Sequence, residues 1–203
     1  MMKNKQNQSV WSQENLKVTE FQNGDSIPLV TSAKDWKKAS ENRSAACCYP
    51  GYNPENGEKY GLIYNGYAIL DERGICPEGL RIPTEVELRE LIAAGMQLEL
   101  DLPKVGLCNG STGYFNNRDL VGYYWSSSIE SVKDEDAIQK NKERESRRSG
   151  YIRRGLGIPD ELRVELDMPE TKQYLKRLYF TGSAANIHGF ELGNGHSVRC
   201  IQI

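Results

Sequence analysis

Apolar residues recur with helical spacing in a few short runs of this chain, and turn-forming residues separate those runs. The clearest run is PTEVELRELIAAG, residues 83–95. Thr84 and Glu87 have the spacing of a capping box, and Gly95 stands where a helix commonly ends. We predict a helix here, with an apolar face formed by Leu88, Leu91 and Ile92.

A second, shorter helix is predicted at residues 32–39, where Ser32 can cap the first turn and Asp35 stands three residues later. Elsewhere, β-branched and aromatic residues lie between clusters of glycine, asparagine and proline, which is typical of short strands and turns. The strands or extended segments that we predict are residues 16–21, followed by a turn at 23–25, and residues 61–70, 98–107 and 122–128.

The C-terminal stretch differs from the rest of the chain in its charge. Between Leu178 and His196 the only formally charged residue is Glu191. Small residues, amides and single aromatics fill this span, and glycines punctuate it. The pattern predicts two or three short strands joined by tight turns, with the final strand at residues 197–201.

Length and charge set broad limits on the protein. The 203 residues suit one domain, and the formal net charge of −2 argues against a whole molecule built to bind nucleic acid. No apolar run is long enough to span a membrane, and the first residues have no apolar core typical of a secretory signal. We expect residues 1–10 to be disordered and residues 11–203 to form a single domain.

A charged insertion is predicted at about residues 130–177. Basic residues dominate positions 140–154, where only Glu143 and Glu145 oppose them, and acidic residues dominate the next part. Such a segment is most simply a solvated insertion. A contact with phosphate or an acidic partner, or a contact between subunits of a homo-oligomer, stays open.

Catalysis and metal binding receive little support. There are five cysteines without a CxxC pair and only two histidines, His188 and His196, so we expect no metal and no cofactor. Neither histidine has an acid or serine partner at a recognisable spacing, and the NGSTG run at 109–113 lacks the lysine-serine end of a phosphate-binding loop. We therefore expect a protein that is not an enzyme.

Several ordered motifs resemble the Fibrobacter succinogenes major paralogous domain family. The most specific is RGICPEG at 73–79 running into RIPT at 81–84. The resemblance covers nearly the whole chain except residues 1–10 and the charged insertion, and His196 stands where the family has an aromatic residue. The other motifs are Trp11 with residues 14–19, residues 23–28, YGLIYN at 60–65 with residues 67–68, YWSSS at 124–128 and SVRC at 197–200.

The resemblance implies an α+β, C-type-lectin-like fold with short helices, small antiparallel sheets and much loop. In such folds both termini meet in one sheet, so the last strand belongs to the core. Cys76 and Cys200 are then expected to be neighbours, with a disulfide left open. With Trp125 and Arg199 they form the expected structural frame.

The same resemblance suggests a recognition surface. Some proteins of this fold are targets of diversity-generating retroelements, in which residues after a tryptophan-serine-serine motif vary on a fixed backbone. Tyrosine, asparagine, serine and glycine suit that use, because rigid aromatic area and adaptable hydrogen bonds favour recognition. The positions that we expect to be displayed for ligand binding are Tyr179, Thr181, Gly182, Ala184, Asn186, His188, Gly189, Phe190 and Glu191.

These inferences together favour a non-enzymatic binding protein, such as an adhesin or a phage receptor-binding protein, located on a cell surface or a phage particle. Its expected partner is a protein or glycan on a target cell. Two alternatives stay open. One is a structural surface module without a dedicated ligand, and the other is contact with nucleic acid or an acidic partner through the basic residues at 140–154.

Overall fold

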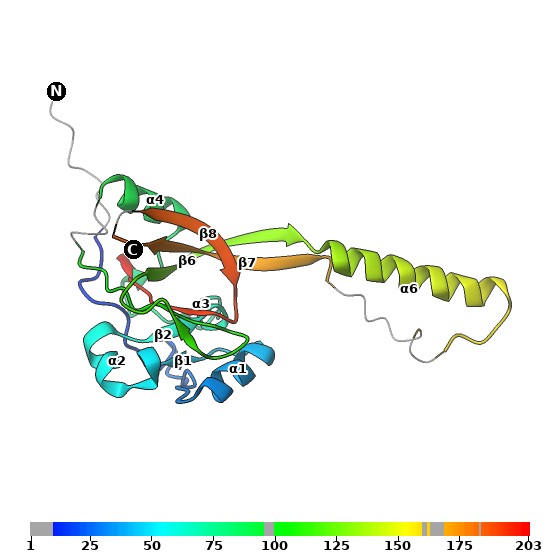
Figure 1. The fold of residues 1–203 in the computed structure, drawn as a ribbon, viewed down its shortest axis with the longest axis horizontal. Helices are drawn as coiled ribbons and strands as arrows, with labels where there is room; N and C mark the ends of the chain where they lie inside the picture. Colours follow the sequence, from blue (N-terminus) through cyan, green and yellow to red (C-terminus); the bar gives the residue numbers. More distant parts are fainter. Residues whose placement is uncertain (1–9, 96–99, 160–161, 163–168, 183) are drawn as a thin grey trace, which may run out of the picture. The chain divides into compact units, whose positions relative to one another are not determined.

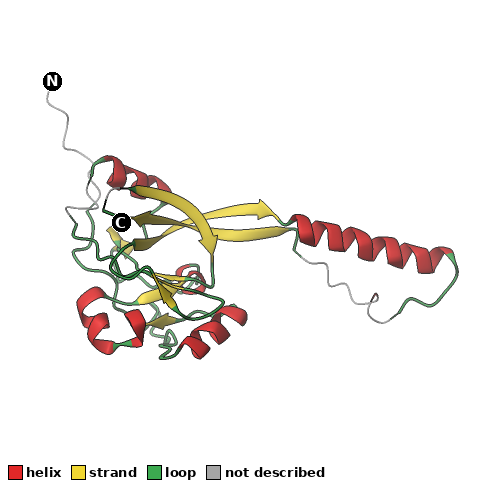
Figure 2. Ribbon diagram, viewed as in Figure 1, coloured by secondary structure: helices red, strands yellow, loops and turns green. Residues whose placement is uncertain are grey.

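The computed structural model describes residues 10–95, 100–159, 162, 169–182 and 184–203, and the chain divides into two compact units. The first unit comprises Met1–Glu130 with Tyr174–Ile203, and the second comprises Ser131–Gln173. Helices and small antiparallel sheets alternate with long loops, which is the predicted α+β class (Figure 1, Figure 2). The predicted disorder of residues 1–10 and part of the predicted extended segment 98–107 lie outside the described residues.

The helices of the first unit are short and begin at polar caps. Ser32 accepts from the Asp35 amide at the start of α1, as predicted. Thr84 and Glu87 form the predicted capping box of α4, and Gly95 follows that helix with a positive φ of 70°. The helical segments are α1 (Ala33–Glu41), η1 (Pro50–Tyr52), α2 (Pro54–Tyr60), α3 (Gly66–Ile69) and α4 (Glu85–Ala93).

Three sheets make up the strand content. The five-stranded sheet has the order β1-β2-β9-β4-β5, with β1 at Cys47–Cys48, β2 at Ile63–Asn65, β9 at Gly195–His196, β4 at Leu107–Cys108 and β5 at Phe115–Asn116. The two-stranded sheet pairs β10 (Ile201–Gln202) with β3 (Leu80–Arg81). The three-stranded sheet has the order β6-β7-β8, with β6 at Gly122–Lys133, β7 at Thr171–Phe180 and β8 at Ala185–Glu191.

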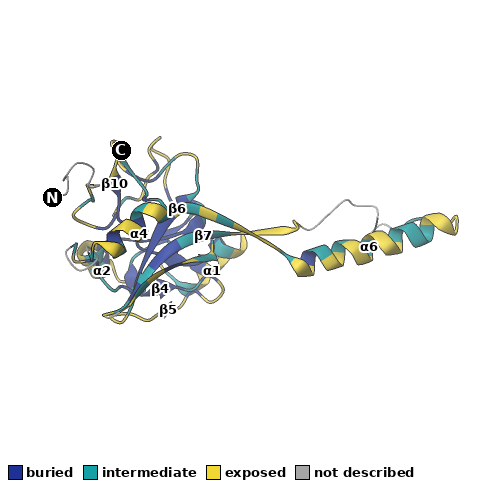
Figure 3. Ribbon diagram, turned by 90° about the horizontal axis from the view of Figure 1, so that it is seen from above, coloured by how far each residue is buried: buried dark blue, intermediate teal, exposed yellow. Residues whose placement is uncertain are grey.

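Apolar side chains from these elements form the core of the first unit. Trp36 and Trp125 are completely buried, and each indole N–H donates to a backbone carbonyl: Trp36 to Gly193 over 3.1 Å and Trp125 to Tyr64 over 2.8 Å. These two hydrogen bonds satisfy the N–H groups of both buried indoles. Figure 3 shows the buried parts of β6 and β7 in dark blue.

The two ends of the described chain lie side by side. Trp11 forms a β-bridge with Ile201, and the Ser12 amide donates to the Cys200 carbonyl over 2.8 Å. Arg199 reinforces this pairing from the interior, because its guanidinium is 3% exposed and donates to the carbonyls of Ser12 and Gln13. Its Nε also donates to Asn15 Oδ1 over 3.0 Å. The chain's last strand is therefore a core strand, as expected.

Two sequence predictions are wrong in detail. The segment 61–70 is strand only at β2 and turns helical at α3, because the Asn65 side chain accepts from the Ala68 amide and starts a new helix. The final strand is β10 rather than residues 197–201. Ser197 instead forms an isolated bridge to Tyr124, and the buried residues Val198 and Arg199 lie between this bridge and β10.

Residues 16–21 form a connecting segment instead of the predicted edge strand. Within it the one β contact is an isolated bridge between Glu20 and Ser26, which closes the predicted turn around Gly24. The Leu16 amide is engaged by the Val198 carbonyl over 2.9 Å, so the segment pairs with the chain's end rather than with a strand of its own.

The second unit contains the helix α6 (Glu135–Arg153). Asp134 caps it by accepting from the Ala137 amide, and its carboxylate also pairs with Lys172 over 2.9 Å. The hydrogen bond with Lys172 holds the pKa of Asp134 below its ordinary value. Most side chains along α6 are exposed or half-exposed, and Ala137 is the buried residue of the helix.

We predict that Arg199→Met lowers the free energy of unfolding by about 2–4 kcal/mol, because the buried Asn15 amide oxygen and the carbonyls of Ser12 and Gln13 lose their donor. Urea unfolding followed by tryptophan fluorescence measures this loss. The control is Arg89→Met, which removes an exposed pair with Glu85 one turn away in α4 and should cost less than about 0.5 kcal/mol. Equal losses for the two variants would contradict the role given to Arg199.

Candidate functional site

The nine expected display positions lie on the end of β7, the following turn and β8. The turn is closed by the Thr181 amide, which donates to the Ala184 carbonyl over 2.8 Å. None of the nine residues is fully buried. Five are exposed, namely Gly182, Ala184, Asn186, His188 and Glu191, and four are half-buried, namely Tyr179, Thr181, Gly189 and Phe190.

Strand alternation divides these residues between two faces of the β6-β7-β8 sheet, because successive side chains point to opposite sides. In the β7-β8 register Tyr179 lies opposite Asn186, and Leu178 lies opposite Ile187. Leu178 and Ile187 are buried against α4, so Tyr179 and Asn186 point to the other face. We call this other face the recognition face, and its members on β8 are Asn186, His188 and Phe190.

Gly189 and Glu191 belong to the α4-packed face instead, since each is one residue out of phase with His188 and Phe190. A Cβ built on Gly189 would lie 2.6 Å from the Glu130 carboxylate, and Lys176, opposite Gly189, pairs with that carboxylate over 2.7 Å. The residues expected to act together are thus separated, and a smaller group remains on the recognition face.

Stacking of two aromatic rings holds side chains of the recognition face in place. The rings of Tyr179 and His188 stack with centroids 5.5 Å apart and an interplanar angle of 17°. Such pairs fix two side chains without a covalent link and present a flat aromatic surface. Asn186, exposed beside them, adds an amide that can donate and accept.

Arg177 and His196 are buried beneath this face, and neither was predicted from the sequence to have a binding role. Arg177 lies opposite His188 in the register and is 7% exposed. His196, on β9, is completely buried, and its ring lies 5.4 Å from the Tyr123 ring and 4.1 Å from the Trp125 ring. Burial lowers the pKa of His196 well below its ordinary value, and the charge of Arg177 adds to that effect.

A signal for Arg177 was present in the sequence. Leu175, Arg177 and Tyr179 alternate with Leu178 and Phe180, so a strand that begins before Leu178 would place Arg177 beside Tyr179. We instead predicted that the charged insertion extended to residue 177, which hid the strand. His196 was considered for metal binding and catalysis and noted as a departure from an aromatic position, but not as part of a binding face.

The expected frame residues surround the end of the chain. Trp125 and Arg199 are buried in the contacts described above. The Sγ atoms of Cys76 and Cys200 are 2.8 Å apart, which confirms that the two cysteines are neighbours, and both thiols are free. The Cys200 thiol, together with burial, raises the pKa of Cys76.

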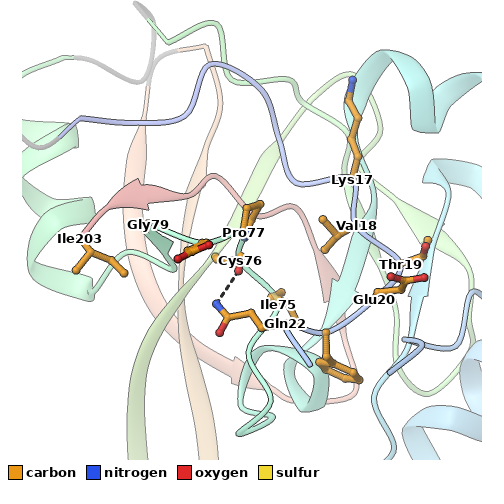
Figure 4. A pocket seen from close by; sticks show the side chains of 12 residues that line it. Lys17, Val18, Thr19, Glu20, Gln22, Ile75, Cys76, Pro77, Gly79 and Ile203 are labelled. Atoms are coloured by element: carbon orange, nitrogen blue, oxygen red, sulfur yellow. Dashed lines mark hydrogen bonds between the residues drawn. The ribbon is translucent and has the colours of Figure 1, made fainter. Parts of the chain in front are cut away.

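A shallow groove of about 890 Å³ lies next to this frame (Figure 4). Its walls are the segments 17–22 and 75–79, with Ile203 at one end. The Gln22 side-chain amide donates to the Cys76 carbonyl over 2.7 Å, which joins the two walls. Lys17, Glu20 and Glu78 bring charges of both signs to the groove. It shows no cluster of groups that would select one ligand.

Among the described residues no group of three or more histidine, cysteine, aspartate or glutamate side chains is arranged to hold a metal ion. None of the helices that the structure describes combines the length and apolar character needed to cross a bilayer.

Comparison with known proteins gives one finding. The family model described as Fibrobacter succinogenes major domain matches residues 5–111, which is just over half of the chain. No curated protein and no solved structure matches. The matched segment contains α1, α4 and the first part of the frame, and it ends before the β6-β7-β8 sheet.

We predict that the recognition face tolerates change while the face behind it does not. Asn186→Ala combined with His188→Ala should lower the free energy of unfolding by no more than about 1.5 kcal/mol, since only exposed contacts and one ring stack are lost. Ile187→Ala, between them in the same strand, should cost about 2–4 kcal/mol because Ile187 is buried. Chemical denaturation measures both, and a double variant as costly as Ile187→Ala would refute this assignment of faces.

Proposed function

This chain belongs to the Fibrobacter succinogenes major domain family, and we propose that it is a non-enzymatic ligand-binding protein whose recognition face is formed by β7 and β8. The observation that carries the proposal is the contrast between the two sides of this hairpin. One side is anchored by Leu178, Phe180 and Ile187 in the core, and the other presents Tyr179, Asn186 and His188.

The chemistry of the face suits binding rather than catalysis. Tyr179 and His188 supply a rigid stacked surface, and rigid aromatic area binds at low entropic cost. His196 is completely buried and has no hydrogen-bond partner on either ring nitrogen. A general base needs a reachable proton and a group that orients it, and His196 has neither.

The anchoring of the hairpin explains how such a face could change its side chains between copies. β8 is an edge strand of its sheet, and Asn186 and His188 on its recognition face are exposed, whereas its pairing with β7 depends on the backbone. We propose that the protein is a variable protein of a diversity-generating retroelement, with a protein or glycan on a target cell as its ligand and a cell surface or phage particle as its location.

A second candidate function rests on α6. Its basic residues, including Lys140, Lys142 and Arg147, lie on a helix whose side chains are mostly exposed or half-exposed. A contact of that helix with an acidic partner would be weakened strongly by salt. This candidate is favoured less, because acidic residues of the same helix offset much of its charge.

We predict that the full chain captures ligands on a cell-surface or glycan array through the recognition face. Tyr179→Ser with Asn186→Ala and His188→Ala should weaken capture at least about tenfold while shifting the melting temperature by only a few degrees, because these side chains are exposed or half-exposed. The matched control is Lys140→Gln with Lys142→Gln and Arg147→Gln in α6. Capture that is lost in the α6 variant and kept in the recognition-face variant would overturn the proposal in favour of the basic helix.

A separate prediction concerns related copies of the gene. If the hairpin is a retroelement target, copies from related genomes should differ mainly at the recognition-face and turn positions, since those substitutions leave the core unchanged. A reverse transcriptase gene and a near-copy of the 3′ end should lie nearby. Sequencing of such loci tests this, and differences spread evenly over the chain would contradict it.

A further inference from the structure

A buried positive charge without a counter-ion lies beside the recognition face. The Arg177 guanidinium carbon lies 4.0 Å from the centroid of the Phe190 ring, 4.4 Å from that of Tyr123 and 5.7 Å from that of Tyr179. The rings cover the faces of the guanidinium, and cation–π attraction offsets part of the cost of burial. We call this arrangement the aromatic cage.

Several hydrogen-bonding atoms in and beside the cage have no partner. Arg177 Nε and Nη1 are buried and have no hydrogen-bond partner, and no described carboxylate forms an ion pair with the side chain. His196, whose ring lies 5.6 Å from that of Phe190, also has both ring nitrogens buried without a partner. Buried polar groups in folded proteins are nearly always hydrogen-bonded, so two adjacent groups without partners indicate an incomplete site.

The nearest carboxylates of the sheet are not available to complete it. Glu130 is paired with Lys176 over 2.7 Å, and Lys176 points to the face packed on α4 because it is adjacent to Arg177 in β7. Glu191 is also on that opposite face. Burial lowers the pKa of Arg177 to about 10, which still leaves the side chain charged at neutral pH. The charge is therefore present and uncompensated.

We propose that Arg177 is the anchor for a carboxylate group of the ligand that binds at the recognition face. The inference rests on the proposed function and names the chemistry of its ligand. Because aromatic rings occupy the faces of the guanidinium, a carboxylate would have to approach along an edge. There Nη2, together with either Nη1 or Nε, offers two parallel N–H groups that match its two oxygens. His188 and Asn186, exposed on the neighbouring strand, flank the approach.

A singly charged group fits the cage better than a phosphate dianion. Arg177 is the one cation in the cage, since burial keeps His196 neutral and Lys176 lies on the other face. A second negative charge would be brought into an apolar surrounding without compensation, which is strongly unfavourable. The carboxylate could come from an acidic sugar or from a peptide terminus, and both are distinguishable by experiment.

The test is a titration of the full, ¹⁵N-labelled chain with glucuronate and, separately, with N-acetylglycine, followed through the Arg177 Nε–Hε resonance. Glucose and chloride at matched ionic strength are the controls. We expect a saturable shift of that resonance with one or both carboxylates and none with the controls. A stronger response to glucuronate assigns the source to a sugar acid, and a stronger response to N-acetylglycine assigns it to a peptide terminus. Shifts absent with both, or equal with chloride, would overturn the inference.

Two variants separate binding from folding. Arg177→Met removes an unpaired buried charge, so it should keep or raise the melting temperature while the carboxylate no longer stabilises the protein against heat. Arg177→Lys keeps the charge without the planar fork and should weaken carboxylate binding at least about tenfold. Stabilisation of Arg177→Met by carboxylate equal to that of the unaltered chain would contradict the inference.

The outcome also separates this inference from the function on which it rests. Array capture that depends on Tyr179, Asn186 and His188 but is unchanged in Arg177→Met would leave the recognition face in place and remove the carboxylate anchor. Loss of capture in both variants, with both proteins folded, supports the two together. Capture independent of both would remove the proposed function itself.

Discussion

The buried guanidinium of Arg199 is the interaction on which the rest of the first unit depends. It joins the backbone of Ser12 and Gln13 to the chain's last residues, so segments almost 190 positions apart are held in one place. The same guanidinium donates to the side-chain oxygen of Asn15, which is buried and would otherwise lose this partner. A C-terminus that would ordinarily fray is thereby fixed, and the hairpin just ahead of it is attached to a rigid base.

On this fixed base, strand alternation divides the side chains of the hairpin between two faces. Leu178 and Ile187 secure it to α4, while Tyr179 and His188 stack on the opposite face. Arg177 lies on the same face as Tyr179 and His188, and it is buried. If Arg177 anchors a ligand as proposed, its buried charge lowers stability in exchange for binding, as functional sites often do.

Local signals in the sequence predicted the helices α1 and α4, because their caps consist of neighbouring residues. Contacts between distant residues could not be predicted in the same way. Asn65 accepts from the amides of both Ala46 and Ala68, and the first of these partners is far away in the chain, so the switch from β2 to α3 was missed. The recognition-face residues were predicted as a group from resemblance, but their division between two faces depends on the β7 register, and Arg177 was hidden by its charged neighbours.

The most direct test of the central claim is saturation mutagenesis of residues 174–203, with each variant displayed on cells and scored by resistance to protease. We predict tolerance at Asn186 and His188, intolerance at Leu178 and Ile187, and the strongest intolerance at Arg199 and Val198. Resistance that falls equally at Asn186, His188 and Ile187, or that survives most substitutions of Arg199, would contradict a displayed face carried on a locked chain end.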